Sequence, residues 1–243
     1  MDLWEKIMET LNEDQQKQLQ QALETASAER GGMEKQDKVE RFRRLNQFIK
    51  PGQILFAGSS LMEQFPIYEF LQDFDLPLTI YNRGVGGYTT TELMEHMDAC
   101  IYDLKPAHIF INIGTNDMNT LDYTCEGLME NYRQILKGIR EELPEAKLYL
   151  LAYYPVNPSA ANDPVMQEVL KIRTNARITE ANKAVAALAE EFGAVFLDVN
   201  DGITDEKGDL KAEYTIEGMH MYATGYKPVF DALRPVLESL RKS

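Results

Sequence analysis

Residues 54–61, Ile-Leu-Phe-Ala-Gly-Ser-Ser-Leu, begin as a short apolar run and end in a segment with two adjacent serines. An apolar run of this length, closed by glycine, is typical of a strand that is buried on both faces of a sheet. The sequence therefore predicts a strand over Ile54 to Ala57, with Ser59 and Ser60 in the loop that follows it.

Similar apolar runs recur along the chain and alternate with amphipathic segments of helical spacing. The other predicted strands are 78–81, 108–113, 147–152 and 194–197, and the predicted helices are 90–104, 125–143, 164–192 and 224–240. Buried strands separated by helices indicate a parallel sheet with helices on both faces. Five such strands favour a three-layer α/β domain of flavodoxin-like order, in which ligands bind beyond the carboxyl ends of the strands.

The first fifty residues are instead rich in Gln, Glu, Lys and Arg, and they carry two apolar stripes of helical spacing. The stripes are Leu3, Trp4, Ile7, Met8 and Leu11, and then Val39, Phe42, Leu45, Phe48 and Ile49. We predict an N-terminal helical extension over 1–50, broken at Gly31-Gly32 and stopped by Pro51-Gly52, before a catalytic domain over 51–243. Two roles remain open for the extension, a lid or brace on the domain and a docking element that builds a homo-oligomer.

The composition excludes several classes of partner. The formal net charge is −14, which repels nucleic acid and anionic lipid headgroups because both need a basic surface. No run of 18 apolar residues is present, and the acidic N-terminus lacks the features of a signal peptide. We expect no nucleic-acid partner, no membrane span and a cytoplasmic protein, in which Cys100 and Cys125 remain reduced.

Four short segments carry groups that chemistry requires, and three of them follow predicted strands. They are 58–61, GSSL; 82–87, NRGVGG; 114–117, GTND; and 217–220, EGMH. The carboxyl ends of parallel strands lie at one edge of the sheet, so the first three should meet there. Together they offer a hydroxyl, a run of backbone amides and a carboxamide, while the fourth offers a carboxylate three residues before a histidine.

These groups are the ones that acyl transfer needs. Serine becomes a good nucleophile when a base takes its proton, and the base needs an acceptor at its other ring nitrogen. Hydrogen-bond donors must also lie where the carbonyl oxygen becomes negative. Each segment has a structural alternative: an ordinary turn, a phosphate loop, a helix cap, or a structural histidine. Their combination in one chain order favours a catalytic site.

The four segments resemble those of the SGNH hydrolases, the GDSL-like esterases and acylhydrolases. ILFAGSSLMEQF resembles the family's first block, YNRGVGGYTT the second, FINIGTNDMN the third and YTIEGMHMYATGY the last. The resemblance covers roughly residues 52–240. It implies Ser60 as the nucleophile and His220 as its base, with an oxyanion hole made by the Ser60 and Gly87 amides and the Asn116 side chain.

The sequence departs from the family pattern at two positions. Ser59 stands where the family often has aspartate before the nucleophile, and Glu217 stands where it has the aspartate three residues before the histidine. Glutamate can still accept a hydrogen bond from the ring, so Glu217 is the expected partner of His220. A backbone carbonyl, Asp198 or Asp201 are the alternatives.

The remaining expectations concern the pocket and the reaction. Five residues after strand ends are candidates for the substrate pocket: Arg83, Tyr88, Met118, Tyr154 and Asn157. His96 and His108 have no partners at metal-ligand spacing, so we expect neither a metal nor another cofactor. The leading function is hydrolysis of a small acyl ester, such as an acetylated carbohydrate, through an acyl-Ser60 intermediate. The alternatives are a thioesterase or lysophospholipase, and a binding protein that keeps the fold without the chemistry.

Overall fold

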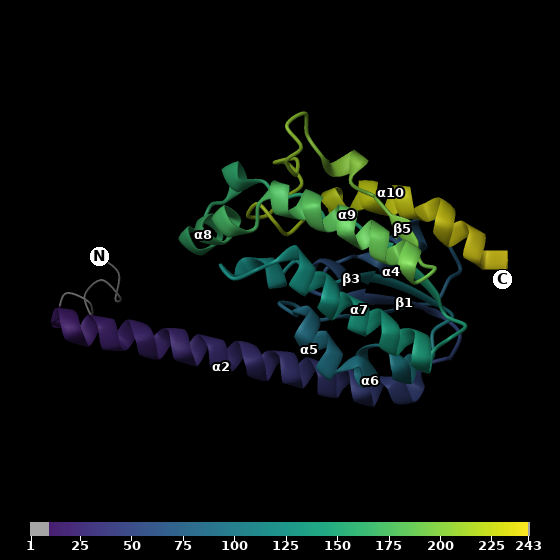
Figure 1. Cartoon of the computed structure of the whole chain (residues 1–243), viewed down its shortest axis with the longest axis horizontal. Helices are drawn as coiled ribbons and strands as arrows, with labels where there is room; N and C mark the ends of the chain where they lie inside the picture. The colour runs from purple at the N-terminus through teal and green to yellow at the C-terminus, as the bar shows by residue number, and fades with distance from the viewer. Residues whose placement is uncertain (1–9, 243) are drawn as a thin grey trace. The chain divides into compact units, whose positions relative to one another are not determined.

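The structure is a computed structural model that describes residues 10–242 (Figure 1). It contains two compact units, one up to Arg41 and one from Phe42 onward. The first unit consists of most of the helix α2, Glu13–Leu45. The apolar stripe predicted over Leu3 to Met8 lies outside the described residues, whereas the second unit contains every segment with predicted chemistry.

Helix α2 runs without interruption through Gly31 and Gly32, so the predicted break there is wrong. Each glycine costs about 1 kcal/mol relative to alanine inside a helix. The neighbouring Gln, Glu, Lys and Arg residues are good helix formers, and they outweigh that local cost. The helix ends at Leu45 and continues as a short 3-10 turn before Pro51-Gly52.

The second unit is built on a five-stranded parallel sheet in the order β2-β1-β3-β4-β5, which confirms the predicted fold. The strands are β1 (Ile54–Gly58), β2 (Ile80–Gly84), β3 (His108–Asn112), β4 (Lys147–Leu151) and β5 (Val195–Leu197). In register, Gly58 lies opposite both Gly84 and Asn112. The loops after β1, β2 and β3 therefore leave the sheet side by side at one edge.

The remaining elements connect or cover these strands. The helices are α3 (Ser60–Glu63), α4 (Ile67–Asp73), α5 (Thr90–Glu95), α6 (Met97–Cys100), α7 (Cys125–Glu142), α8 (Pro164–Ile172), α9 (Asn175–Glu191) and α10 (Ala223–Ser239). The 3-10 turns are η1 (Asn46–Phe48), η2 (Tyr102–Leu104), η3 (Asp117–Asn119), η4 (Pro158–Ala160), η5 (Asp201–Ile203) and η6 (Leu240–Lys242).

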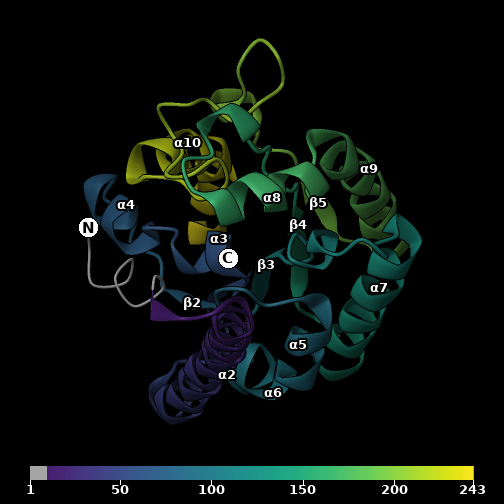
Figure 2. The same ribbon diagram turned by 90° about the vertical axis from the view of Figure 1, so that its left-hand side faces the viewer.

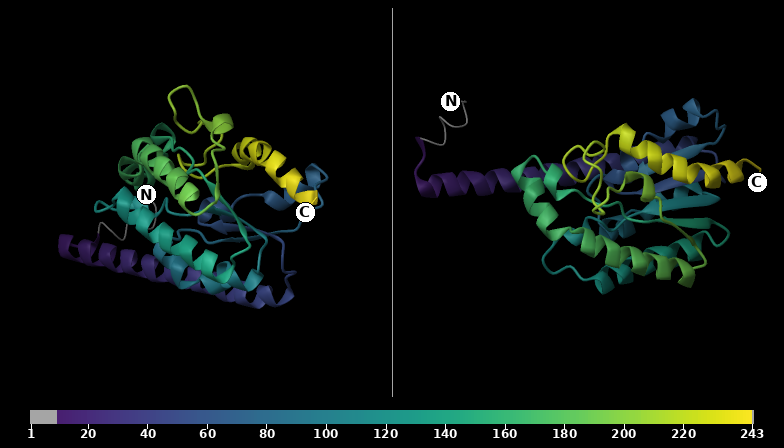
Figure 3. Two further views of the ribbon diagram at one scale, coloured as in Figure 1. Left: turned by 45° about the vertical axis from the view of Figure 1, so that its right-hand side comes forward. Right: turned by 90° about the horizontal axis from the view of Figure 1, so that it is seen from above.

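Helices cover the sheet on both faces. Figure 2 shows α4 and α10 on one side of the strands and α5, α7 and α9 on the other. Figure 3 shows α7 and α9 side by side. The core under α4 and α10 is rich in aromatic side chains, with Phe56 and Phe110 of the sheet both fully buried. Burial on both faces is why these strands appear in the sequence as continuous apolar runs.

The single helix predicted over 164–192 is wrong, because the structure divides it into α8 and α9. Arg173 ends α8 with a non-helical backbone (φ −80°, ψ 88°). Thr174 then caps α9, since its side chain accepts a hydrogen bond from the Arg177 N–H. Threonine satisfies an otherwise unpaired N–H at a helix start, which favours a new helix over a continued one.

Within residues 10–242, none of the helices combines the length and the apolar character that crossing a lipid bilayer requires.

Candidate active site

The loop after β1 presents Ser60 at the edge of the sheet. Gly58 ends the strand with a φ of +150°, and a side chain there would collide with the Asn112 carbonyl of the adjacent β3. The N–H groups of Met62 and Glu63 bond to the Ser59 carbonyl and start α3 directly after this turn. Ser59 points into the protein and is fully buried, whereas Ser60 is partly exposed.

The loop before α10 carries His220 and Glu217 in a tight reversal. Thr215 and Met221 form an antiparallel bridge, and the Ile216 N–H bonds to the His220 carbonyl at 2.8 Å. Gly218 lies at the tip of the loop with a φ of +98°, a conformation that favours glycine. The loop therefore turns the carboxylate of Glu217 back toward the ring three residues later.

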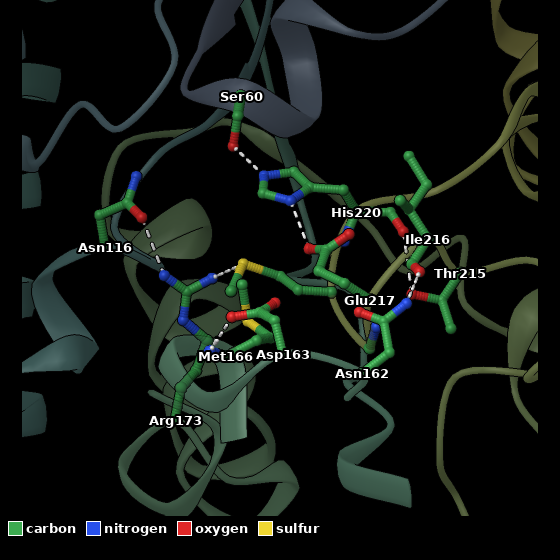
Figure 4. A network of polar contacts seen from close by, with 12 residues as sticks. Ser60, Asn116, Asn162, Asp163, Met166, Arg173, Thr215, Ile216, Glu217 and His220 are labelled. Carbon is green, nitrogen blue, oxygen red and sulfur yellow. Dashed lines mark hydrogen bonds and ion pairs between the residues drawn. The ribbon is translucent and has the colours of Figure 1, made fainter. Parts of the chain in front are cut away.

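Ser60, His220 and Glu217 form a continuous hydrogen-bonded chain (Figure 4). The Ser60 Oγ lies 2.9 Å from His220 Nε2, and His220 Nδ1 lies 2.5 Å from Glu217 Oε1. The carboxylate can only accept, so the Nδ1–H donates to Glu217 and Nε2 accepts from the serine hydroxyl. This is the geometry that nucleophilic acyl transfer requires.

Glu217 is held in its ionised form. Burial alone would raise the pKa of this carboxyl group, but the hydrogen bonds from His220 outweigh burial, and the pKa lies below its ordinary value. One of those bonds comes from the His220 backbone N–H, 3.1 Å from the same Oε1. A carboxylate fixed by both the ring and the backbone of one residue holds that ring in a defined orientation. Asp198, an alternative partner in the sequence, instead accepts from the Asn200 N–H.

Gly87 lies in the turn after β2. The Tyr88 N–H bonds to the Val85 carbonyl, and Gly87, the residue before Tyr88, has a φ of +74° that this turn requires. The Gly86 N–H donates to the Glu63 carboxylate at 2.5 Å, which ties the turn to α3. Gly87 therefore lies between two anchored residues beside the helix that begins with Ser60.

Asn116 lies in the loop after β3 and bridges two parts of the site. Its Nδ2 donates to the Tyr88 carbonyl at 2.9 Å, and its Oδ1 accepts from Arg173 at 2.8 Å. The amide nitrogen has two N–H groups, so one remains after the bond to Tyr88. Asp117, the next residue, holds the start of α5 through bonds from the Thr90 backbone and hydroxyl. Asp117 thus joins the second and third loops.

The five candidates for the substrate pocket, which could equally be packing residues, are all at least nine-tenths buried, and this favours packing: Arg83, Tyr88, Met118, Tyr154 and Asn157. Arg83, for example, bonds to the Asn46 side chain and lies over the Phe42 ring. His96 and His108 each lie beside a tyrosine hydroxyl, as structural histidines do.

A cavity of about 460 Å³ lies between α9 and β5. Its lining contains none of the predicted catalytic and oxyanion-hole residues, which are Ser60, Gly87, Asn116, Glu217 and His220. Two of its amide side chains already bond to the backbone. Asn182 bonds to both backbone groups of Tyr153, and Asn175 does the same for Val156. These two amides bond to the segment after β4 in the place where a neighbouring strand would do so beyond the end of β5, so we assign Asn175 and Asn182 a structural role.

Two residues that support the site, Glu63 and Arg173, were not predicted from the sequence. Arg173 falls in the helical pattern predicted over 164–192, where a charged side chain is normally solvated, and Glu63 lies in no predicted helix or strand. Thr174 could have indicated the break at Arg173, because threonine is a preferred N-cap and predicts that a new helix starts there.

The fold and the serine–histidine–glutamate geometry define an α/β protein with a hydrolase-like site. The model of the GDSL-like lipase/acylhydrolase family matches residues 66–227, which is more than half of the 243-residue chain. The chain therefore belongs to this family, and the resemblance seen in the sequence is confirmed. The matched range includes Gly87, Asn116, Glu217 and His220 and begins just after Ser60.

Curated relatives carry more specific names. The chain is 25% identical over 189 residues to platelet-activating factor acetylhydrolase IB subunit alpha1 of Bos taurus, covering 77% of this chain and 76% of that protein. It is 24% identical over 203 residues to the alpha2 subunit of Homo sapiens, covering 79% and 83%.

Solved structures share the fold. A Streptococcus pneumonia protein described as a candidate platelet activating factor is 32% identical, with a TM-score of 0.77 over 89% of this chain and 99% of that one. A GDSL-like lipase of Bacteroides thetaiotaomicron is 20% identical, with a TM-score of 0.68 over 83% of this chain and 98% of that chain. At that identity the likeness shows the fold alone.

Proposed function

We propose that the protein is a serine esterase that hydrolyses small acyl esters through an acyl-Ser60 intermediate. The observation that carries this proposal is the hydrogen-bonded chain from Ser60 Oγ through His220 to Glu217. Family membership supports it, because the family consists of GDSL-like lipases and acylhydrolases.

In the acylation step, His220 Nε2 takes the proton of Ser60 as Oγ attacks the carbonyl carbon of the ester. The oxyanion that forms accepts hydrogen bonds from the Ser60 and Gly87 backbone amides and from Asn116 Nδ2. The imidazolium then gives its proton to the leaving alcohol oxygen as the carbon–oxygen bond breaks. Glu217 stays ionised throughout and offsets the charge on the ring.

Deacylation repeats the sequence with water as the nucleophile. His220 takes a proton from water as the hydroxide oxygen attacks the acyl carbon, and the same donors hold the second oxyanion. The proton returns to Ser60 Oγ when the acyl bond breaks. One carboxylic acid leaves, and the enzyme is restored.

Asn116→Ala tests the oxyanion role of the amide. We expect kcat for p-nitrophenyl acetate to fall by about 10²–10³, the usual loss for one oxyanion donor. KM should change little, because the donor acts on charge that exists only in the transition state. Steady-state kinetics of the parent and the variant measure both constants. A change confined to KM would assign Asn116 to ground-state binding instead.

A short acyl group is the substrate class we propose, on the strength of the acetylhydrolase names of the curated relatives. Acyl-chain selection is measured with p-nitrophenyl esters from acetate to octanoate. We expect kcat/KM to be highest for acetate and to fall by about 10-fold or more along the series, because each misfit methylene changes binding by about 1–3 kcal/mol.

The same series separates the alternatives. A maximum at long chains would favour a lysophospholipase, and a preference for the matching thioester would favour a thioesterase. No hydrolysis, together with no labelling by a fluorophosphonate, would favour a binding protein that keeps the fold.

For the helical segment up to Arg41 we propose a role outside the chemistry, such as building a homo-oligomer, because all four site loops follow Gly52.

A further inference from the structure

Arg173 is a buried cation whose contacts are all with neutral groups. Its side chain is 1% exposed and is one of the largest fully buried side chains among the described residues. Its Nε donates to Asn119 Oδ1 at 2.9 Å, Nη2 to Asn116 Oδ1 at 2.8 Å, and Nη1 to Met219 Sδ at 2.7 Å. None of these acceptors carries a charge.

Burying a charge away from a charged partner costs free energy of desolvation. A residue that is kept despite this cost normally has a specific role. Burial lowers the pKa of Arg173 to about 10, while the nearby charges of Asp117 and Glu217 act in the opposite direction. The guanidinium therefore remains protonated at neutral pH. A fixed positive charge lies behind the loop that carries Asn116.

The break between α8 and α9 explains how this side chain reaches the interior. The non-helical backbone at Arg173 turns the residue away from the helical course, and Thr174 restarts the helix immediately afterwards. The guanidinium then contacts two loops of the site at once. One contact is Asn116, and the other is Met219, the residue before His220.

The contact with Arg173 acts together with the bond to the Tyr88 carbonyl to set which way the Asn116 amide faces. In Figure 4 the amide oxygen points to Arg173, and the amide nitrogen lies on the side of Ser60. If the amide turned over, an oxygen would face the developing oxyanion and repel it. A cation on the carbonyl oxygen also polarises the amide, which makes its N–H groups stronger donors.

We propose that Arg173 is a positioning residue for the oxyanion hole, which holds the Asn116 amide with Nδ2 toward the reacting carbonyl and strengthens it as a donor. The inference rests on the proposed esterase function. It assigns Arg173 no contact with substrate, because the side chain is buried and each of its three nitrogens already bonds to a protein group.

Arg173→Met is the central test, with p-nitrophenyl acetate as the substrate. We expect kcat to fall by about 10–100-fold, up to the loss for one oxyanion donor, with KM within about 2-fold of the parent. If Arg173 acts through Asn116, the two effects are not additive. The double variant Asn116→Ala/Arg173→Met should then have the kcat of Asn116→Ala alone, within about 3-fold.

Arg140→Met is the matched control for loss of packing. Arg140 also donates to several neutral acceptors, the carbonyls of Ala146, Phe192 and Gly193, but none of these belongs to the site. We expect this variant to lower the melting temperature without changing kcat. If Arg173→Met does not fold, Arg173→Lys replaces it. An ammonium cannot bond to Asn116 and Asn119 in the forked geometry, so kcat should still fall by about 5-fold or more.

Three results would overturn the inference: an unchanged kcat in a folded Arg173 variant, a loss confined to KM, or fully additive losses in the double variant. A parent chain with no Ser60-dependent hydrolysis would contradict the proposed function itself. The two failures are distinguishable, because the first requires an active parent whose activity is lost in Ser60→Ala.

Discussion

Ser60→Ala is expected to lower kcat for p-nitrophenyl acetate by about 10⁴–10⁶, the scale of loss when the nucleophile of a catalytic triad is removed. The variant lacks the oxygen that would form the acyl bond, while His220 and Glu217 keep their own contact. Labelling by a fluorophosphonate should be lost as well, because that reagent needs the same oxygen. Initial rates and intact-mass measurement of the labelled protein give the two readouts.

Ser59→Ala is the matched control on the adjacent residue. The Ser59 hydroxyl is fully buried and has no hydrogen-bond partner among the described residues. Removing a buried polar group that lacks a partner costs little stability, so activity and labelling should both remain. Labelling that survives in Ser60→Ala but disappears in Ser59→Ala would mean that the other hydroxyl is the nucleophile.

Glu217→Gln is expected to lower kcat by about 10²–10⁴, since the comparable aspartate-to-asparagine change in a serine protease triad costs about 10⁴. The glutamine amide has the shape of the carboxylate but can present its NH₂ group to His220 Nδ1. That contact stabilises the tautomer with the proton on Nε2, which cannot accept the proton of Ser60. The amide also cannot offset the charge of the imidazolium.

Glu217→Asp separates the effect of the carboxylate charge on kcat from the effect of side-chain length. Aspartate keeps the carboxylate but is one methylene shorter in a loop that holds Glu217 Oε1 2.5 Å from the ring. We expect a modest loss in kcat, smaller than that of Glu217→Gln. Near-full activity of Glu217→Gln across the pH range would show that another acceptor orients His220. Measuring kcat for both variants between pH 5 and pH 9 distinguishes these outcomes.

The sheet could be predicted from the sequence because its central strands are buried on both faces. Ile109, Phe110 and Ile111 of β3 are fully buried, and such continuous apolar runs stand out from amphipathic helices. Right-handed helical crossovers limit the possible strand orders to a handful, and the observed order is among them. Each predicted strand overlaps an observed one, with boundaries that differ by up to three residues.

What was missed around the site has one cause, since local patterns do not reveal tertiary neighbours. Tyr154 and Met118 follow strand ends as pocket residues do, yet both point back into the core. The partners of Arg173 lie 46 to 57 residues away in the chain, so no local window contains them. The Gly31-Gly32 pair failed for the opposite reason, because good helix formers on both sides outweigh two glycines.

The site residues were easier to recognise than their surroundings. Ser60, Gly87 and Asn116 each follow a buried strand, and parallel strands bring such loops to one edge. Glu217 and His220 are three residues apart, so their contact requires only a local turn. Arg173 and Glu63 had no such positional signal, because they support the site from helices rather than from strand ends.

The short reversal that carries Glu217 and His220 has a consequence for how activity is assembled during folding. A contact across three residues closes a very small loop and needs little from the rest of the chain, whereas Ser60 and His220 are separated by 160 residues. We therefore expect the contact between His220 and Glu217 to form independently of the loop that carries Ser60. The proposed site is complete only when the C-terminal segment docks on the loop after β1, so we expect turnover to report folding of the whole domain.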